Sequence, residues 1–445
     1  MVSPVEHHYD TMKTIPPPLV KSHLNAWMGP LLPLLASTVL ALGIPGSVAG
    51  DYPAYPAFDE EMRSYKATEP TGAIASLHQQ MESGAVRLTR DSTHGYLASL
   101  LRELNVPASS QLLVASKTSP NKALISPKNP RALYFNDQVS VAYVPSAELI
   151  EVAAADPRLG VVFYTLAQKP AERPRLVRDD RCLECHASAK TLNVPGILVR
   201  SFLTKDDGEV ELLSGLLVDH RTPLADRWGG YYVTGQHGRQ THRGNLFGTQ
   251  AIALHEKDPS CNANITDLTP LLDIGKYPSA GSDIVALLTH EHQAHAQNLL
   301  TRIYYDSLAA LRDGGSLRPA YPAIEAALRY MLFVEEAPLT MPVKGTSHFA
   351  AEFQKSGPGD SRKRSLRQLN LQTRLFEHPC SYMIYSTSFE ALPQEARRHF
   401  YRRLWDVLNG EDPSLEFAKL GAESRRAIRE ILLATKKDLP AYWRL

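Results

Sequence analysis

Short apolar segments separated by turn-forming residues fill the chain between positions 111 and 166. Aliphatic, β-branched and aromatic residues dominate these segments, and SPKNP and DQ stand between them. Runs of this length, bounded by Pro, Asn, Asp and Ser, predict strands joined by turns. We therefore expect a small sheet built from QLLVAS (111–116), ALYFN (132–136), VSVAYVP (139–145) and LGVVFYTL (159–166), followed by shorter strands at ILVRSFL (197–203), EVELLSG (209–215) and YYVTG (231–235).

Apolar residues recur at helical spacing in other parts of the chain. Short runs predict small helices at 77–82 and 94–104, and longer runs predict helices over 283–305, 321–334, 382–409 and 422–436. The expected fold class is α+β, with a β-containing N-terminal half and a mainly helical C-terminal half. The expected organisation is a leader over 1–50, a β-containing region over 51–280, and a helical region over 281–445 packed on it.

The first fifty residues have the layout of a secretory signal peptide. Lys13 and Lys21 precede an apolar run over 31–42, and the small-residue sequence Ser47-Val48-Ala49 follows it. A basic flank, a short apolar run and a small-x-small site are typical of an exported protein whose leader is removed. A membrane anchor is the alternative, but the run is shorter than the ~20 residues that a spanning helix needs. We expect export, with cleavage close to Ala49, and no membrane span in the mature chain.

The net charge of the chain limits the classes of binding partner that are expected. The 445 residues include 48 Lys and Arg against 47 Asp and Glu, which gives a formal net charge of +1. This balance creates no field that attracts a polyanion, so no nucleic-acid partner is expected. The hydrophobic fraction of 43% is ordinary for a globular protein with a buried core.

Two of the four cysteines stand in the sequence Cys182-Leu183-Glu184-Cys185-His186. C-x-x-C-H is the attachment signature of c-type haem. Two thiols on one helical turn reach the two vinyl groups on one edge of the porphyrin, and the next residue points its imidazole at the iron. The signature predicts one covalent haem c, attached to Cys182 and Cys185, with His186 as an iron ligand in the region over 51–280.

Other uses of the two thiols fit the sequence less well. A thioredoxin-like redox pair lies in a βαβ pattern, and a zinc site needs further Cys or His ligands at characteristic spacing. Neither pattern is found, and a structural disulfide does not call for His186. Pro195 predicts a loop whose backbone carbonyl contacts the His186 imidazole, with an ordinary turn as the alternative. Cys261 and Cys380 are left as either paired or free.

The far side of the iron has several candidate ligands. A glycine-rich segment after the motif contains His237 and His242, and we expect one of them to be the second iron ligand. Arg239 and Arg243 in the same segment are candidates for pairing with the haem propionates, because a guanidinium matches a carboxylate. A surface loop with solvated side chains is the alternative. Met341 is the other candidate ligand, and an iron left open for a small molecule is a further possibility.

The predicted helix over 283–305 carries polar groups within an apolar face. The face defined by Ile284 and Leu288 continues through Glu291 and His295, with His292 at its edge. Polar groups on such a face need partners or carry function. If this helix faces the haem, Glu291, His292 and His295 form a peroxidase-like acid–base set, and His292 is a further candidate iron ligand. A buried ion pair is the alternative.

Several segments together resemble a family of bacterial cytochrome c domain-containing proteins. They are PRALYFND (130–137), DPRLGVVFYTL (156–166), CLECHAS (182–188), VPGILVRS (194–201), RWGGYYVTGQHG (227–238) and CSYMIYS (380–386). The resemblance spans nearly everything after the predicted signal peptide. It implies an exported monohaem protein, located in the periplasm, and it implies no particular reaction.

These observations predict an exported monohaem c-type cytochrome that acts in electron transfer. The expected partner is a redox partner protein or a small-molecule electron donor or acceptor. Two alternatives remain: a peroxidase-like haem oxidoreductase with an open or displaceable distal site, and a haem-based sensor or binding module. The chain is several times longer than the ~100 residues of a simple haem domain, which favours a role beyond a bare electron carrier.

Overall fold

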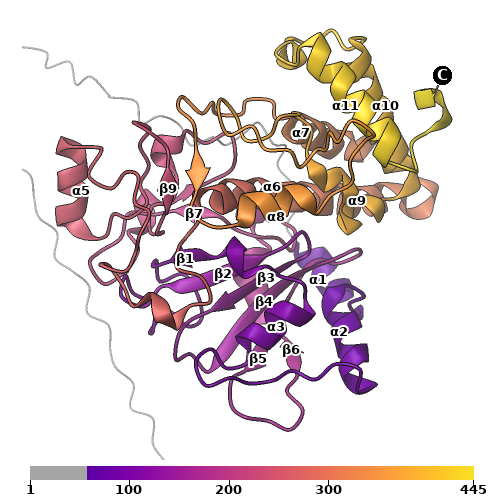
Figure 1. Ribbon diagram of the computed structural model, residues 1–445. Coiled ribbons are helices and arrows are strands. Elements are labelled where there is room, and N and C mark those ends of the chain that lie inside the picture. The colour runs from indigo at the N-terminus through magenta and orange to yellow at the C-terminus, as the bar shows by residue number, and fades with distance from the viewer. Residues whose placement is uncertain (1–57, 445) are drawn as a thin grey trace, which may run out of the picture. The chain divides into compact units, whose positions relative to one another are not determined.

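Six strands that follow one another along the chain form one antiparallel sheet (Figure 1). The computed structural model describes residues 58–444. Each strand pairs with the next in the order β1 (Leu112–Val114), β2 (Arg131–Phe135), β3 (Val139–Tyr143), β4 (Leu149–Asp156), β5 (Gly160–Ala167) and β6 (Leu176–Arg178). Four of these strands coincide with predicted segments, but β4 and β6 do not. The β4 sequence LIEVAAAD contains Glu, Asp and three alanines, which are depleted in strands, so its pattern is weak.

One face of the sheet is sealed by the first three helices. Side chains that alternate along the strands point to this face, and Ala132, Tyr134, Val152 and Ala154 are at most 3% exposed. They share an apolar cluster with α1 (Asp59–Ala67), α2 (Ala73–Glu82) and α3 (Leu97–Glu103). The intervening residues of the same strands therefore point to the opposite face, toward the C-terminal half.

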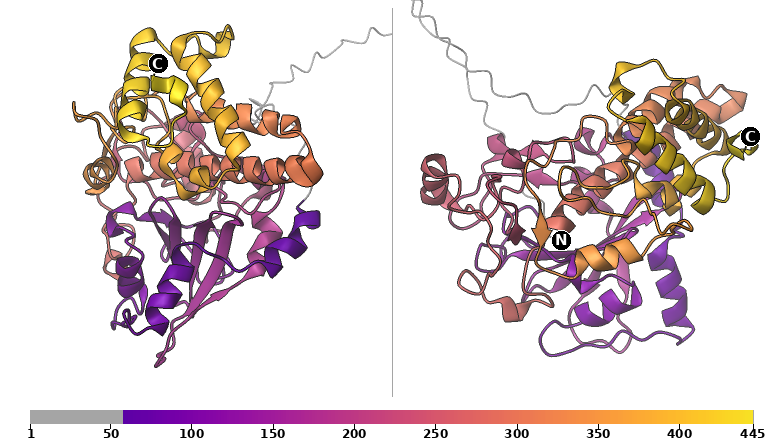
Figure 2. Two further views of the ribbon diagram at one scale, coloured as in Figure 1. Left: turned by 90° about the vertical axis from the view of Figure 1, so that its right-hand side faces the viewer. Right: turned by 45° about the horizontal axis from the view of Figure 1, so that its top comes forward.

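The C-terminal half is built around one long helix, α6 (Ile284–Leu311). Its N-cap is Asp283, whose carboxylate accepts hydrogen bonds from the backbone N–H groups of Val285 and Ala286. Most of α6 is buried, because the sheet lies on one side of it and helices from later in the chain pack on the other (Figures 1 and 2). Within residues 58–444, no helix combines the length and the apolar character needed to cross a membrane.

The later helices stack outward from α6. Helix α7 packs on α6, α10 packs on α7, and α11 packs on α10. Their bounds, with those of the remaining helices, are α4 (Leu183–His186), α5 (Gly248–Lys257), α7 (Tyr321–Met331), α8 (Phe349–Lys355), α9 (Thr387–Glu390), α10 (Gln394–Asn409) and α11 (Ala422–Thr435).

Two predicted elements are wrong. The single helix expected over 382–409 is a 3-10 turn followed by α9 and α10. Ser386 caps α9 through a hydrogen bond that its hydroxyl accepts from the Phe389 N–H, and Pro393 directly precedes α10, so each residue begins a new helix. The strand expected over 209–215 is instead a 3-10 turn at Leu212–Ser214.

The remaining strands are only two residues long. They form two small ribbons, β7 (Arg200–Ser201) with β8 (Leu216–Leu217), and β9 (Gly235–Gln236) with β10 (Lys344–Gly345). The predicted α+β class is confirmed, since the sheet lies in the N-terminal half and helices dominate the C-terminal half. The predicted leader over 1–50 lies outside the described residues.

Candidate functional site

The C-x-x-C-H sequence forms a short helical segment at the end of the sheet. After β6, the Asp179 carboxylate caps a 3-10 turn at Asp180–Cys182, and this turn runs directly into α4. Cys182 is half-buried and Cys185 is exposed, one helical turn apart. Neither is in a disulfide, and burial raises the pKa of the Cys182 thiol to about 11. The two thiols are thus presented together from one turn.

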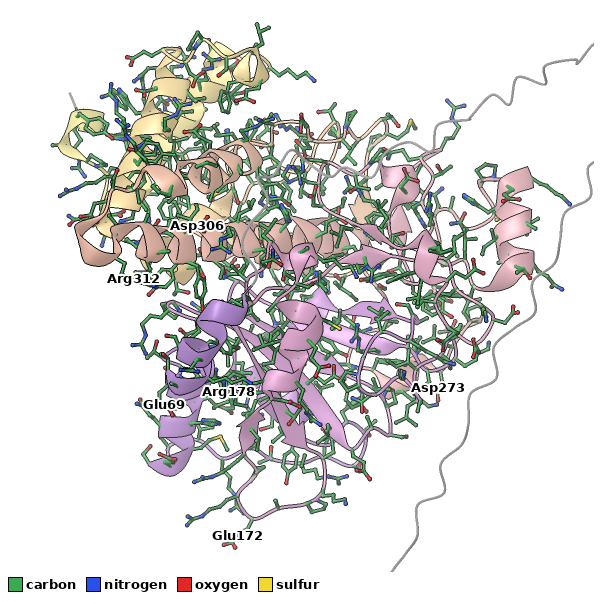
Figure 3. All side chains as sticks on the ribbon, turned by 180° about the vertical axis from the view of Figure 1, so that it is seen from behind. Glu69, Glu172, Arg178, Asp273, Asp306 and Arg312 are labelled. Carbon is green, nitrogen blue, oxygen red and sulfur yellow. The ribbon has the colours of Figure 1, made fainter. Side chains whose placement is uncertain are left out.

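Arg178 in β6 anchors the start of this segment. Its guanidinium donates hydrogen bonds to the backbone carbonyls of Tyr65 (2.9 Å) and Thr68 (3.0 Å) at the C-terminal end of α1. It also pairs with the Asp180 carboxylate at 2.8 Å. Figure 3 places Arg178 beside Glu69, just after α1. The C-terminal end of α1 therefore fixes the position at which the chain leaves the sheet and enters the motif.

The His186 imidazole is held in one tautomer. Its Nδ1 lies 2.9 Å from the carbonyl oxygen of Gly196, and a carbonyl only accepts, so Nδ1 carries the ring proton and Nε2 keeps its lone pair. The prediction of a backbone carbonyl from the Pro195 loop is confirmed, with Gly196 as the residue that supplies it. Burial lowers the pKa of His186, which keeps the ring neutral. His186 has the form that binds a metal through Nε2.

Helix α6 positions the loop that contacts His186. The Asn298 side chain accepts a hydrogen bond from the Ile197 N–H (2.8 Å) and donates one to the Ile197 carbonyl (2.9 Å). A Cβ on Gly196 would lie 2.3 Å from the Asn298 Oδ1, so only glycine fits where the loop meets the helix. The long helix thus supports His186 indirectly, through the loop.

Three strands contribute side chains next to the motif that the sequence analysis did not identify. Phe163 of β5 packs against the His186 ring, with 4.7 Å between ring centroids. Arg131 of β2 and Glu151 of β4 both interact electrostatically with His186 and form a long ion pair of 3.8 Å with each other. All three lie on the face of the sheet that turns away from α1–α3. The strand register places these three side chains on one face. The sequence analysis could not derive this register because it did not predict β4.

Two arginines near the motif have unsatisfied nitrogen atoms. The Nε atoms of Arg131 and Arg200 are buried and have no hydrogen-bond partner. Arg200 interacts electrostatically with Cys185, its guanidinium lies over the Phe202 ring at 4.1 Å, and burial lowers its pKa. Two positively charged guanidinium groups therefore lie near the motif, and positive charge there is compatible with a group that carries carboxylates.

His237 and His242 lie together, with their ring centroids 4.8 Å apart. The Nε2 of His237 accepts a hydrogen bond from the Asn264 N–H, and the Nδ1 of His242 accepts one from the Gly244 N–H, each at 3.0 Å. Burial lowers both pKa values, that of His242 to about 3, so both rings are neutral. The remaining ring nitrogen of each must then carry the proton. In this arrangement neither ring offers a lone pair to a metal.

The other candidates from the glycine-rich segment have surroundings of their own. Arg239 is exposed, and Arg243 pairs with Asp226 at 2.5 Å. The Met341 carbonyl accepts a hydrogen bond from Gln240, so this methionine lies against the segment that contains His237 and His242. In the part of the chain that the structure describes, no hydrogen bond, ion pair or ring contact joins these residues to Cys182, Cys185 or His186.

Glu291 on α6 is 1% exposed and has protein partners for both carboxylate oxygens. Arg227 forms an ion pair with Oε1, and the Trp228 indole donates to Oε2 at 3.1 Å. Burial raises the pKa of Glu291 to about 7, although Arg227 and Trp228 both act to lower it. The Arg227 guanidinium also donates to the backbone carbonyls of His220 and Thr222. The Glu291 carboxylate therefore holds the loop that contains Arg227 and Trp228 against α6.

His292 is fully buried and hydrogen-bonded at both ring nitrogens. Its Nδ1 lies 2.9 Å from the Nδ1 of His220, and its Nε2 lies 2.7 Å from the Ser381 hydroxyl. Burial lowers the pKa of His292 to about 3. His295 is half-buried, with its ring 4.7 Å from that of Tyr330, and burial lowers its pKa to about 4. The structure therefore places the predicted acid–base residues on one helix, with Glu291 and His292 enclosed by protein groups.

The remaining cysteines are both free: Cys380 is buried and Cys261 is exposed. Among residues 58–444, no group of three or more His, Cys, Asp or Glu side chains could hold a metal ion. Comparison of the chain with protein-family models, curated proteins and solved structures found no match. The resemblance to cytochrome c domain-containing proteins therefore stays a prediction, and the site is interpreted from its own geometry.

Proposed function

We propose that this protein is an exported monohaem c-type cytochrome that transfers electrons in the periplasm. One haem is attached through Cys182 and Cys185, with His186 as its axial ligand. The observation that carries the proposal is the hydrogen bond from the His186 Nδ1 to the Gly196 carbonyl, directly after two free thiols on one helical turn. That bond leaves Nε2 as the metal-binding nitrogen, which is the arrangement of a histidine ligand with a backbone partner.

The bound haem supplies a one-electron redox centre. The protein's own groups prepare a place for it. Gly196 holds the His186 ring in orientation, and the guanidinium groups of Arg131 and Arg200 would supply positive charge near a bound haem. The sheet face between Arg131 and Phe163 carries small side chains, which leave room beside a large flat group: Ser140, Ala142 and Ala153.

Exposure favours electron transfer over peroxidase-like chemistry. Cys185 is exposed, so a haem attached there would be within reach of a redox partner or a small electron donor. Glu291 and His292, by contrast, are buried and bonded to other protein groups, and neither is accessible to a substrate. In this proposal they stabilise α6, which in turn positions the loop that contacts His186.

A second function, reversible binding of a small ligand at the iron, is favoured by one observation. The hydrogen bonds of His237 and His242 leave each ring without a lone pair for the iron. The distal position would then be open, as in a sensor or an oxidoreductase. The absorption spectrum of the reduced protein with and without carbon monoxide separates the two functions, because a six-coordinate haem does not respond.

Mass spectrometry of the denatured protein tests the haem itself. We expect the mass of one haem in addition to the mature chain, and loss of that mass when Cys182 and Cys185 are both replaced by serine. Cys261→Ser is the matched control, because Cys261 is also a free, exposed thiol and should leave the haem in place. A protein that binds zinc and no haem would overturn the proposal.

A further inference from the structure

His290 has different surroundings from the other histidines of α6. It is 6% exposed, and its ring packs against Phe135 of β2, with 4.8 Å between ring centroids. In the part of the chain that the structure describes, no hydrogen bond or ion pair reaches the His290 ring, whereas both ring nitrogens of His292 are bonded. An imidazole without a charged partner is neutral at pH 7 and keeps a lone pair on one nitrogen. His290 is therefore chemically able to bind a metal.

A row of residues across the sheet leads from His290 to His186. The row consists of residues that lie directly opposite one another on neighbouring strands: Phe135 of β2, Ser140 of β3, Ala153 of β4 and Phe163 of β5. Directly opposite residues point to the same face of a sheet. The His290 ring packs on the first member of the row and the His186 ring on the last. The two imidazoles therefore lie over the same face of the sheet.

The row is long enough to hold two imidazoles with a metal ion between them. Three strand spacings of about 4.8 Å separate Phe135 from Phe163, which is roughly 14 Å. A bond from an imidazole nitrogen to a metal is only about 2 Å long. The two middle positions, Ser140 and Ala153, have small side chains and are half-buried. The sheet therefore leaves space above it between the two phenylalanines.

Charged neighbours place the His186 ring above this row. Glu151 of β4 and Arg131 of β2 both interact electrostatically with it. Both strands lie on the side of β5 that leads toward His290, and the edge strand β6 lies on the other side. The His186 ring therefore lies over the strands of the row and not beyond its end.

Helix α6 carries His290 and also supports the loop that contacts His186. His290, Ala294 and Asn298 are spaced four residues apart, so they share one face of the helix. The Asn298 side chain binds both backbone groups of Ile197 in that loop. Ala294, between the other two, has a small side chain. The same face of α6 thus holds one histidine directly and the other through its loop.

We propose that His290 is the second axial ligand of the haem iron. Ser140 and Ala153 leave the space for the porphyrin between His186 and His290. This assignment rests on the proposed haem and adds the distal ligand that the C-x-x-C-H motif leaves undetermined. It favours an electron carrier over a site for small ligands, because protein groups then fill both axial positions.

Absorption spectra of the haem-loaded full chain test the assignment. We expect the unaltered protein to be low-spin and, when reduced, not to bind carbon monoxide. His290→Ala should become high-spin and bind carbon monoxide, and added imidazole should restore the low-spin spectrum by binding in place of the lost side chain. An unaltered protein that is already high-spin overturns the assignment, as does a His290→Ala variant with the unaltered spectrum.

His295→Ala is the matched control on the same helix. His295 is half-buried, and its ring lies 4.7 Å from that of Tyr330, so it faces α7. This variant should keep the low-spin spectrum and should not bind carbon monoxide. High-spin haem in both variants would reflect a general disturbance of α6 and would refute a specific role for His290.

His290→Met decides the question if the alanine variant does not fold. Methionine supplies a thioether ligand, so the iron should stay low-spin while its midpoint potential rises. An unchanged midpoint potential overturns the assignment. Mass spectrometry separates this failure from failure of the proposed function. Variants that carry covalent haem without a change in spectrum or potential refute His290 alone, whereas an unaltered chain without covalent haem refutes both.

Discussion

Two regions of this protein combine histidines with arginines and carboxylates, and they differ in what their polar groups contact. Around Glu291 and His292, each charged or ring group has a protein partner: Arg227 and Trp228 for the carboxylate, Ser381 and His220 for the imidazole. Both residues are at most 1% exposed. Of these residues, His220 keeps one buried ring nitrogen, Nε2, without a hydrogen-bond partner.

Around the C-x-x-C-H motif the polar groups are only partly satisfied. The two thiols are free, and Arg131 and Arg200 each keep a buried nitrogen without a partner. The side chains of Arg131 and Glu151 are 15% and 21% exposed. Both regions thus contain a buried nitrogen without a partner, and they differ in exposure and in the two free thiols beside the second. The predictions below test this difference.

The largest effect is expected from removing the Glu291 carboxylate. Glu291→Ala leaves the Trp228 indole without an acceptor and the buried charge of Arg227 without a counter-charge, which should lower the free energy of unfolding by about 3–5 kcal/mol. Glu151→Ala is the comparison: it removes a long, partly exposed ion pair with Arg131 and two hydrogen bonds from Ser119 and Asn121, so a smaller loss of about 1–2 kcal/mol is expected. Chemical denaturation measures both. Equal losses would mean that the two regions do not differ as argued.

Acid should destabilise the haem-free fold through buried, neutral histidines of α6, including His290, whose ring packs against Phe135. Burial lowers the pKa of His290 from 6.5 to about 4, so between these values the unfolded chain binds a proton that the folded protein does not. Stability should therefore fall as the pH drops from 6.5 toward 4, by at most roughly 3 kcal/mol from this residue.

His290→Leu isolates that contribution. Leucine has no titrating proton, so the decline in Tm between pH 6.5 and 4 should be shallower than in the unaltered protein, while the two agree more closely at pH 7. His292 has its pKa lowered to about 3 for the same reason and should maintain part of the slope in the variant. Parallel curves would show that the pKa of His290 does not differ between the folded and unfolded states.

A smaller effect is expected at the proposed haem site. Arg131→Met and Arg200→Met each remove a positive charge beside the haem, which should stabilise the oxidised form and lower the midpoint potential by roughly 20–70 mV. Arg239→Met and Arg243→Met are matched controls, because the first side chain is exposed and the second is paired with Asp226. Redox titration measures all four. A larger shift in the controls would indicate that the arginines of the glycine-rich segment, and not Arg131 and Arg200, lie near the haem propionates.

The smallest effect is expected at the candidate distal ligands. His237→Ala, His242→Ala and Met341→Ala should leave the haem absorption spectrum unchanged, because the two imidazoles are committed to backbone N–H groups. If one of these variants alone becomes high-spin and binds carbon monoxide when reduced, that residue is the iron ligand. The sequence-based expectation of a His237 or His242 ligand would then hold after a local rearrangement.

Helix and strand pattern predicted much of the fold, with failures where the pattern is weak. Short β-rich runs bounded by turn-forming residues identified β2, β3 and β5, and the helical spacing of apolar residues identified α6 and α11. Strand β4 escaped because alanine and acidic residues fill it, although it lies at the centre of the sheet. The helix over 382–409 was extended across Ser386 and Pro393 because periodicity alone ignores such boundaries.

The sequence by itself determined what lies within one turn of chain. Cys182, Cys185 and His186 are neighbours because helical spacing brings them together, and the loop near Pro195 lies close enough to supply the carbonyl that contacts His186. Only the tertiary structure decided which residues from distant parts of the chain lie beside these three and which do not. Arg131 reaches the motif through strand register, and Glu291 is enclosed because Arg227 folds onto α6. Spacing encodes short-range contacts directly, whereas contacts between distant segments depend on how every intervening element packs.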